Sequence, residues 1–460
     1  MSNFEAKSIC ILGRQPALGL AELESLYGAE HVRPAGTAAV LDIPAEQISF
    51  SSLGGTIKVA KLLTVIDSID WKDLARYLFD KIPEHTEHLP GGKFTLGLSV
   101  YGHKVPIKQI EAALLEVKKL IRQTGRPVRI VPNKQPALNS AQVLHNKLTH
   151  KGAWELLFIK DGQRTLLAQT LFVQDIEAYG ARDQARPARD ARVGMLPPKL
   201  AQIMVNLAAG HYQNKEFESW DKADGLRRVR ILDPFCGTGV ILQEALLMGY
   251  SVYGTDIEPR MVEYSQRNIR WLFDKFPSLE GQVDIEIADA TSYQWAGFSA
   301  IASETFLGRP LAKMPDEAAL KQIISDANTV IKKFLQNIAP QLKTGQSLCL
   351  AVPEWRHPVN PQSQGLDGVQ GAVEQRTEPY MKYGEGATET ATPQSAKSAS
   401  GLRLSRKQAG AAPVLRLPLL DKLTDMGYTY WDLKHVRREE LVYYREDQVV
   451  ARRLLRIRKA

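Results

Sequence analysis

The sequence predicts an α/β protein in which residues 199–460 form a doubly wound parallel sheet and the residues before them form two smaller α+β modules. Three observations lead to this prediction. After residue 199, strand-like and helical segments alternate, which is the pattern of a parallel sheet covered by helices. One of these strands runs into a glycine-containing turn and then into a helix. Before residue 176, short strands and helices are mixed, which favours two compact modules over one large sheet.

Composition and charge narrow the class of protein. The 460 residues suffice for two or three domains, and the 44% hydrophobic and 24% charged residues are typical of a soluble globular chain. The net charge of +8 is a weak indication of a polyanionic partner. Three distant cysteines (Cys10, Cys236 and Cys349) and nine histidines without ligand spacing indicate neither a disulfide framework nor a metal site. We find no signal peptide and no membrane-spanning run, and we therefore expect a cytoplasmic protein without membrane contact.

Local hydrophobic patterns predict the elements of the two N-terminal modules. The first module, residues 1–75, contains predicted strands at 8–12 and 38–43 and a helix at 18–27. In the second module, residues 76–176, an amphipathic helix at 107–123 has an apolar stripe of Ile110, Leu114, Val117 and Ile121. The other predicted elements of this module are strands at 93–101, 128–131, 154–160 and 164–170 and a helix at 141–148.

An arginine-rich segment at residues 177–198 separates these modules from the C-terminal domain. It is rich in Arg, Asp, Ala and Pro, and it supports two interpretations equally well: a solvated hinge or a contact with nucleic acid. In the C-terminal domain the predicted strands are 229–232, 251–254, 283–287, 300–303 and 347–352. Residues 358–412 contain few large apolar residues, and we expect them to form a disordered insertion. Residues 441–445 and 449–458 read as a closing β-hairpin.

The strongest functional signal is the sequence ILDPFCGTG at residues 231–239, followed by a helix at 240–248. Glycines allow the chain to turn sharply and to approach a ligand closely at the first strand-to-helix turn of such a sheet. A dinucleotide-binding loop would have a third glycine where Leu242 stands, and no Gly-Lys-Ser/Thr of a P-loop follows. Asp233 suits a cationic amino acid better than a pyrophosphate. S-adenosylmethionine, with its ammonium, sulfonium and nucleoside, matches these residues best.

Two further acids lie where that cofactor would need them. Asp256 ends the second strand about twenty residues after the loop, the spacing expected of a ribose-binding acid. Asp289 ends the third strand, where its carboxylate can accept a bond from the adenine amino group. Cys236 is expected to be a small packing residue rather than a nucleophile. The predicted cofactor-binding residues are Asp233, Phe235, Gly237, Thr238, Gly239, Asp256, Ile257, Asp289 and Ala290.

The sequence at 233–239 resembles the first motif of the THUMP-domain RNA methyltransferases. It is most similar to the family that methylates N2 of guanosine 10 in archaeal and eukaryotic tRNA. Residues 11–16 and 20–23 resemble that family's N-terminal ferredoxin-like domain, and residues 94–99, 138–141 and 173–176 resemble its THUMP domain. Residues 186–187, 195–201 and 204–208 resemble the segment that leads into its catalytic domain, and residues 441–445 its closing strand.

The resemblance implies a Rossmann-like class I methyltransferase domain at 199–460, preceded by ferredoxin-like and THUMP domains. It also implies that the first two domains bind tRNA and that the segment around Pro198 helps to cover the cofactor. The candidate RNA-binding residues are Asn139 and Lys147 in the THUMP-like region and Arg182, Arg186 and Arg189 in the arginine-rich segment. The sequence identifies neither an accessory subunit nor the oligomeric state.

The sequence departs from the family at the position that receives the substrate. Amino-directed methyltransferases of this type carry Asp/Asn-Pro-Pro-Tyr/Phe after the fourth strand, because a carboxylate and a carbonyl align the amine while an aromatic ring stacks the extruded base. Residues 301–308 here read IASETFLG, without either proline. Glu304 is the candidate catalytic acid and Phe306 the candidate stacking ring, although Ser303 fits the acid's position in an alternative register.

Two other functions therefore stay open. One is an RNA-binding protein whose methyltransferase domain is catalytically degenerate, and the other is a methyltransferase for a different amino substrate, such as adenine in DNA. The THUMP-like region argues against DNA. Trp355, which follows the fifth strand, is interpreted either as a residue lining the substrate cleft or as part of a covering loop.

Overall fold

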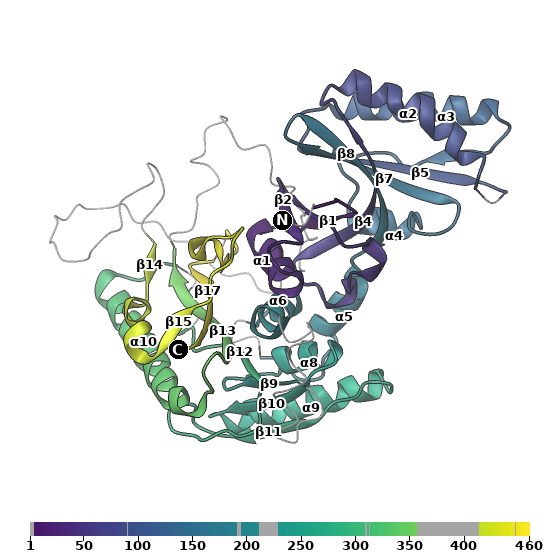
Figure 1. Ribbon diagram of the computed structural model, residues 1–460. Coiled ribbons are helices and arrows are strands. Elements are labelled where there is room, and N and C mark those ends of the chain that lie inside the picture. The colour runs from purple at the N-terminus through teal and green to yellow at the C-terminus, as the bar shows by residue number, and fades with distance from the viewer. Residues whose placement is uncertain are drawn as a thin grey trace, which may run out of the picture.

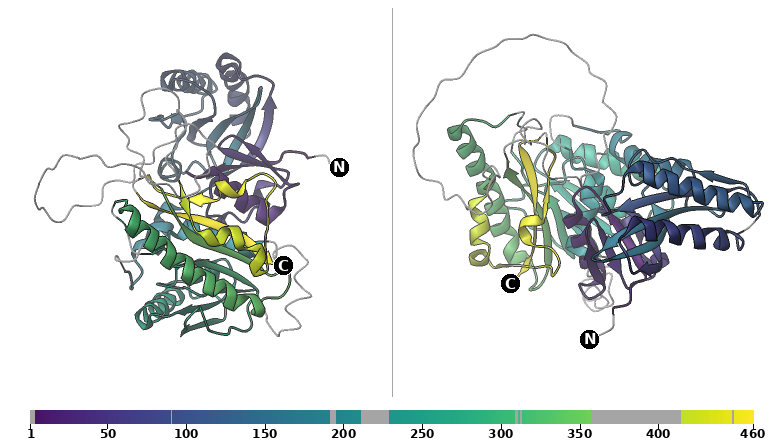
Figure 2. Two further views of the ribbon diagram at one scale, coloured as in Figure 1. Left: turned by 90° about the vertical axis from the view of Figure 1, so that its left-hand side faces the viewer. Right: turned by 90° about the horizontal axis from the view of Figure 1, so that it is seen from above.

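The computed structural model describes residues 4–89, 91–190, 195–210, 229–308, 311, 313–356, 414–446 and 448–460. These residues form two sheets that lie side by side, with helices packed between them (Figures 1 and 2). The predicted insertion at 358–412 lies outside the described residues. None of the described helices is long and apolar enough to cross a membrane.

The N-terminal part is built on one sheet of eight strands in the order β2-β3-β1-β4-β8-β7-β5-β6. Its strands are β1 (Ser8–Leu12), β2 (Val32–Ala35), β3 (Ala38–Leu41), β4 (Thr56–Ile66), β5 (Phe94–Tyr101), β6 (Val128–Ile130), β7 (Ala153–Asp161) and β8 (Arg164–Val173). Its helices are α1 (Pro16–Tyr27), α2 (Trp71–Thr86), α3 (Ile107–Gln123), α4 (Ser140–His145) and α5 (Ile176–Gln184).

This continuous sheet corrects the expectation of two separate modules. The reason is β4, an eleven-residue strand absent from the predicted elements. Its first half pairs with β1, where Lys61 lies opposite Ser8, and nearly its whole length pairs with β8, from Lys58 opposite Val173 to Ile66 opposite Thr165. A strand of this length joins the two sets of strands through backbone hydrogen bonds, so the modules share a sheet.

The helix α3 has the predicted bounds and orientation. Ile110, Leu114, Val117 and Ile121 are all buried, and they pack with α2 against β5 and β7. The 3.6-residue period of these side chains was sufficient to predict the buried face.

The C-terminal domain contains a second sheet in the order β11-β10-β9-β12-β13-β17-β15. Its strands are β9 (Arg230–Asp233), β10 (Ser251–Asp256), β11 (Val283–Ile287), β12 (Ala300–Glu304), β13 (Ser347–Trp355), β15 (Tyr428–Tyr430) and β17 (Val450–Lys459). The first five are parallel, as predicted, and β17 runs antiparallel to β13. Two short strands complete the sheet: β14 (Leu415–Arg416) pairs with β13, and β16 (Val442–Tyr443) pairs with β17. The antiparallel pairing of β16 with β17 confirms the predicted closing hairpin.

Helices cover both faces of this sheet. The helices α6 (Pro198–Ala209), α8 (Val240–Leu247) and α9 (Pro259–Lys275) pack on one face, and α10 (Glu317–Ile338) packs on the other. Neighbouring residues of one strand therefore enter different cores: Ile231 packs towards α6 and α8, whereas Leu232 packs towards α10. Burial on both faces explains why the central strands β12 and β13 are mainly apolar, whereas the edge strand β11 alternates apolar and acidic residues.

The N-terminal part is attached to the C-terminal domain through α1 and α6, which lie together between the two sheets (Figure 1). A Cβ on Gly54 would lie 2.0 Å from the Lys199 carbonyl oxygen, so only glycine permits this close approach of the two parts. The buried carboxylate of Glu22 on α1 accepts the Gly54 N–H at 2.9 Å, the Gly55 N–H at 2.8 Å and the Asn206 amide at 2.8 Å. The Glu22 side chain thus connects the turn before β4 to α6.

We expect Glu22→Ala to lower the free energy of unfolding by about 3 kcal/mol or more, because three buried donors lose their acceptor. Urea denaturation measures this change. Glu46→Ala, at an exposed position of the same part of the chain, serves as the control and should change stability by no more than about 0.5 kcal/mol. Equal effects of the two substitutions would contradict a joining role for Glu22.

Candidate functional site

The order of the C-terminal sheet places a ligand site at the carboxyl ends of β9 and β12. The chain proceeds from β9 outward to β10 and β11 and then returns to add β12 on the other side of β9. Ligands of open α/β sheets bind where the direction of strand addition reverses in this way. Asp233 ends β9, Asp256 ends β10, Asp289 follows β11 and Glu304 ends β12. The four predicted acids therefore lie along one edge of the sheet.

The loop between β9 and α8 has the conformation that its glycines predict. Gly237 has φ 51° and Gly239 has φ 81°, both in the left-handed region. A Cβ on Gly239 would also lie 2.9 Å from the Ser265 hydroxyl oxygen. Both the backbone angle and this close contact therefore favour glycine at position 239. The Ser265 hydroxyl donates to the Gly237 carbonyl at 2.8 Å and fixes the turn to α9.

Asp233 is buried behind this loop and joins the two central strands. Its Oδ1 atom accepts the Ser303 hydroxyl at 2.6 Å and the Phe235 N–H at 3.2 Å. Burial raises the pKa of Asp233 to about 7, opposed by these two hydrogen bonds. Ser303 is itself fully buried. Ser303 thus supports Asp233, and this favours the register in which Glu304 takes the acid's position.

Asp256 holds the glycine loop from the neighbouring strand. Its Oδ2 atom accepts the Gly237 N–H at 2.9 Å and its Oδ1 atom accepts the Glu258 N–H at 3.0 Å. A carboxylate has about four acceptor positions, so each oxygen can accept a further bond from a ligand hydroxyl. Burial raises the pKa of Asp256 above its ordinary value. Ile257, next in the chain, is 66% exposed and offers an apolar surface at the same edge.

The remaining predicted cofactor residues fall into exposed and packed groups. Asp289 is exposed, and its Oδ1 atom accepts both the N–H and the hydroxyl of Thr291 at 2.8 Å. Ala290 is buried, and the ring of Phe235 packs edge-on against that of Phe334, with 5.2 Å between the ring centroids. Thr238 is partly buried in the loop.

Glu304 is largely buried and forms an ion pair with Arg452 of β17. Burial raises the pKa of Glu304, whereas the Arg452 guanidinium lowers it. The next residue, Thr305, donates its N–H at 3.0 Å and its hydroxyl at 2.9 Å to the Ala351 carbonyl. Proline has no N–H to make the first bond, which gives a physical reason for the missing proline. Phe306 is 43% exposed, an unusual state for a phenylalanine ring.

The burial of Cys236 and Trp355 tests the predictions made for these two residues. Cys236 is buried, and burial raises the pKa of its thiol well above the ordinary value, which confirms a packing role. Trp355 is fully buried in the core beside α10, so both sequence interpretations of it, cleft lining and loop cover, are wrong. Its place in β13 follows from the extension of that strand to residue 355.

The predicted RNA-binding residues differ in how accessible they are. Lys147 and Arg189 are exposed, and Asn139 is exposed but caps α4 by accepting the Gln142 N–H at 2.8 Å. Arg182 donates to the Glu244 carboxylate at 2.9 Å, and Arg186 is buried against the cofactor loop. The described part of the arginine-rich segment is therefore packed on the C-terminal domain, which corrects its interpretation as a solvated hinge. A phosphate contact by Arg182 or Arg186 would require these internal contacts to break.

Two residues that the sequence analysis missed complete the site. Arg452 lies 148 positions from Glu304 in the chain, and no local pattern connects them. Asn268 on α9 donates to the Thr238 carbonyl at 2.8 Å, and thus holds the cofactor loop from behind. The sequence did carry a signal for Asn268, because it is one of two polar residues, with Ser265, on the mainly apolar buried stripe of α9. In the described residues, no group of three or more His, Cys, Asp or Glu is arranged to hold a metal ion.

The site also brings together two distant sequence motifs. Arg14 and Gln15, just before α1, both donate to the Tyr444 carbonyl, at 2.9 Å and 2.6 Å. Tyr443 pairs with Arg452 in the closing hairpin. The N-terminal part of the chain therefore reaches the residues beside Glu304.

Comparison with known proteins supports the predicted resemblance. No family model matches the chain. Over 197 residues the chain is 32% identical to the tRNA (guanine(10)-N2)-dimethyltransferase of Methanothermobacter thermautotrophicus, covering 42% of this chain and 48% of that protein. Over 113 residues it is 35% identical to the protein of the same name from Pyrococcus abyssi, covering 24% of this chain and 27% of that protein. The chain thus has distant homologues of this name and spans at most about half of their length.

Solved structures resemble the chain over a larger share. TrmN from Thermus thermophilus matches with a TM-score of 0.42 and 18% identity, covering 76% of this chain and 89% of that chain. SMU.472, described as a putative methyltransferase complexed with SAH, matches with a TM-score of 0.42 and 12% identity, covering 75% and 89%.

We expect the stability of Asp233→Asn, measured relative to the wild type, to be higher at pH 8 than at pH 5. Because burial raises the pKa of Asp233 from 3.8 to about 7, the stability that its protonated form contributes is present below pH 3.8 and is lost as the pH rises through 7. Asn keeps an acceptor for Ser303 and Phe235 and stays neutral at both pH values. The melting-temperature difference between variant and wild type should therefore be more positive at pH 8.

Thermal melts at the two pH values measure this difference, which amounts to at most about 1.4 kcal/mol for each pH unit between the two pKa values. Asp274→Asn, on the exposed side of α9, is the matched control and should change stability by no more than about 0.5 kcal/mol. A difference for Asp233→Asn that is the same at both pH values would contradict a protonated buried carboxyl.

Proposed function

We propose that the protein is a cytoplasmic S-adenosylmethionine-dependent methyltransferase that modifies the exocyclic N2 amine of a guanosine in tRNA. The observation that carries this proposal is the convergence of a glycine loop and four acids at the switch point of a parallel sheet, with Glu304 and the exposed ring of Phe306 at the end of the adjacent strand. The names of the distant homologues support the choice of tRNA guanine as the substrate.

The residues at the sheet edge fit the three chemical parts of the cofactor. S-adenosylmethionine supplies a methyl group activated by a sulfonium. Asp256 is placed to accept the ribose hydroxyls, as the acid after the second strand does in nucleotide-binding sheets. Asp289 and the exposed Ile257 are the proposed contacts of the adenine. Asp233 provides negative charge for the ammonium, and a bound cation would lower its raised pKa.

Glu304 and Phe306 are the proposed contacts of the target base. The lone pair of a guanine amino group is delocalised into the ring, so a carboxylate that accepts an amine hydrogen aligns it for attack. Arg452 helps to keep Glu304 ionised and holds its side chain in one orientation. An exposed ring two residues later suits stacking on a base taken out of its helix.

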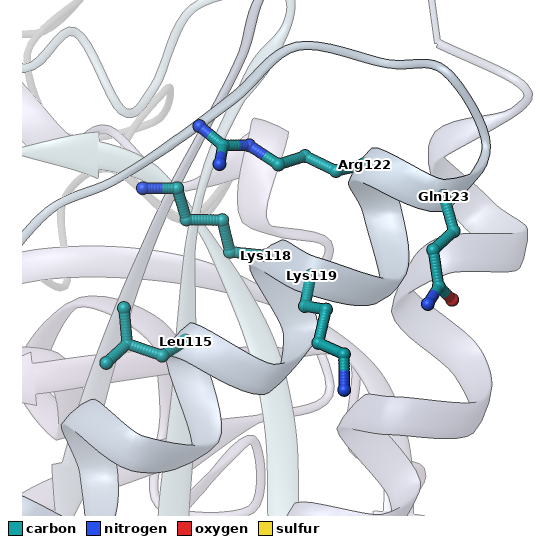
Figure 3. A pocket seen from close by; sticks show the side chains of 5 residues that line it. All are labelled: Leu115, Lys118, Lys119, Arg122 and Gln123. Carbon is teal, nitrogen blue, oxygen red and sulfur yellow. The ribbon is translucent and has the colours of Figure 1, made fainter.

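The N-terminal part offers basic surface for the RNA backbone. On α3, the side chains of Lys118 and Arg122 extend in the same direction, with Lys119 on the adjacent face (Figure 3). These residues, together with Leu115 and Gln123, line a pocket of 450 Å³. Because α1 and the Arg14–Tyr444 contact fix this part beside Glu304, RNA bound on it would have one position relative to the site.

The ion pair of Glu304 favours a second candidate function. The Glu304 carboxylate is already paired with a guanidinium, and this makes it a weaker acceptor for a substrate amine. The second candidate is therefore an RNA-binding protein that transfers no methyl group. The two functions differ in whether a methyl group reaches RNA.

We expect the wild-type protein to transfer a labelled methyl group from S-adenosylmethionine to tRNA and to yield N2-methylated guanosine. Nucleoside mass spectrometry identifies the product. Glu304→Gln should lower the rate on the order of a hundredfold or more, because the amide keeps the size but not the charge that aligns the amine. Its affinity for S-adenosylhomocysteine should stay nearly unchanged.

Ser303→Ala separates the two registers. If this variant loses transfer at unchanged cofactor affinity while Glu304→Gln is fully active, Glu304 is not the catalytic acid. If the wild-type protein binds tRNA but methylates no RNA in a total small-RNA pool, the non-catalytic function is correct instead.

We also expect tRNA affinity to fall steeply with salt, because basic side chains displace counterions from the phosphates. In the full-length protein, Lys118→Gln with Arg122→Gln should weaken binding and reduce the slope of log affinity against log salt by roughly one to two. Filter binding at several salt concentrations measures the slope. Lys332→Gln with Lys333→Gln on exposed positions of α10 is the matched control, and equal slopes for the two double variants would refute the α3 contact.

A further inference from the structure

Arg186 is a buried arginine attached to the cofactor loop. It is 3% exposed, and its guanidinium donates to the Thr238 hydroxyl at 3.3 Å and to the Met195 sulfur at 3.3 Å. Among the described residues, Arg186 is the only basic residue whose side chain is hydrogen-bonded to residues 233–239. Its position is therefore part of the loop's construction rather than of the protein surface.

The segment that carries Arg186 is fastened to the C-terminal domain on its far side. The side chain of Asn268 accepts the Ala188 N–H at 2.9 Å and donates to the Ala188 carbonyl at 2.9 Å. The same amide donates to the Thr238 carbonyl at 2.8 Å. Asp190 forms an ion pair with Arg260 of α9 at 3.0 Å. These contacts hold Arg186 and the cofactor loop in a fixed relation.

The hydrogen-bonding capacity of Arg186 is only partly used. Its buried Nε atom has no hydrogen-bond partner, and within the described part of the chain its guanidinium forms no ion pair with a carboxylate. A thioether sulfur is a weak acceptor, so Met195 does not replace an anion. The nearby Glu244 directs its Oε1 atom to Arg182 at 2.9 Å. Burial, together with the charge of Arg189, lowers the pKa of Arg186. The carboxylates of Asp183 and Glu244 raise this pKa through their charge, without a hydrogen bond to the guanidinium among the described residues. A buried guanidinium without a directly bonded anion is costly.

We propose that Arg186 binds the carboxylate of the amino-acid end of the cofactor, an inference that rests on the proposed function. Asp233, Asp256 and Asp289 suit an ammonium, a ribose and an adenine, but they repel a carboxylate. A guanidinium presents donors in a fork that matches a carboxylate, and here it lies at Thr238 of the loop that the cofactor would approach. Arg186 and Asp233 then recognise the two opposite charges of one α-amino acid.

This role replaces the RNA contact predicted for Arg186 from the sequence. It also explains why an arginine of a segment that precedes the C-terminal domain is buried next to the glycine loop. Deleting its charge would affect the amino-acid end of the cofactor and leave the nucleoside contacts of Asp256 and Asp289 in place.

Calorimetry with two ligands tests the proposal. S-adenosylhomocysteine carries the amino-acid carboxylate, whereas 5′-methylthioadenosine has the same nucleoside and thioether without it. Arg186→Gln should weaken S-adenosylhomocysteine on the order of tenfold to a hundredfold, the loss expected for charge-assisted hydrogen bonds. Its affinity for 5′-methylthioadenosine should change less than about twofold. Arg186→Lys, which keeps the charge but not the fork, should lose an intermediate amount.

Arg270→Gln, at an exposed position of α9, is the matched control and should leave both affinities unchanged. Unchanged S-adenosylhomocysteine affinity in both Arg186 variants overturns the proposal. Equal losses for the two ligands also overturn it, because Arg186 would then only shape the loop. If Arg186→Gln does not fold, the ratio of the two affinities in Arg186→Lys decides in the same way. If the wild-type protein binds neither ligand, the proposed cofactor is wrong and this inference falls with it, a failure visible before any substitution.

Discussion

The hydrogen bond from the Ser303 hydroxyl to Asp233 joins the carboxyl ends of β9 and β12 at the point where the sheet reverses its direction of growth. The loop that begins at Asp233 and the residue that follows Ser303 are both positioned by this bond. Asp256 holds the other side of the same loop through the Gly237 N–H. The candidate cofactor residues and Glu304 thus share one support, and a change at Asp233 would be transmitted to both.

Buried carboxylates recur wherever two parts of the molecule meet. Glu22 connects α1 to α6, Asp233 connects β9 to β12, and Glu244 connects α8 to the segment after β8. Burial raises the pKa of each to about 7. Each carboxylate accepts at least one hydrogen bond from a group distant in the chain, so it specifies one arrangement at the cost of stability at higher pH. Apolar contacts alone would hold the same elements together with less definite geometry.

The charges around the candidate site follow from this arrangement. Parallel strands bring their carboxyl ends to one edge, and four of these strands end in acids or lead into one. Arginines from outside this set of strands balance part of the charge: Arg452 comes from the antiparallel strand β17 and Arg186 from the segment before α6. The site is therefore completed by residues of the closing hairpin and of the arginine-rich segment, and the isolated parallel strands would lack both cations.

The sequence by itself determined the parts of the protein that depend on neighbouring residues. The bounds of α3 follow from a 3.6-residue period, the turn at 237–239 from its glycines, and the order of Asp233, Asp256 and Asp289 from the predicted strands that precede them. Only the tertiary structure decided that β4 merges the N-terminal strands into one sheet, that Trp355 is buried, that Arg452 pairs with Glu304 and that Arg186 packs on the cofactor loop. The pairings of β4 and the contacts of Arg452 and Arg186 join residues 44 to 148 positions apart. Their existence depends on sheet order and helix packing, which no local pattern contains.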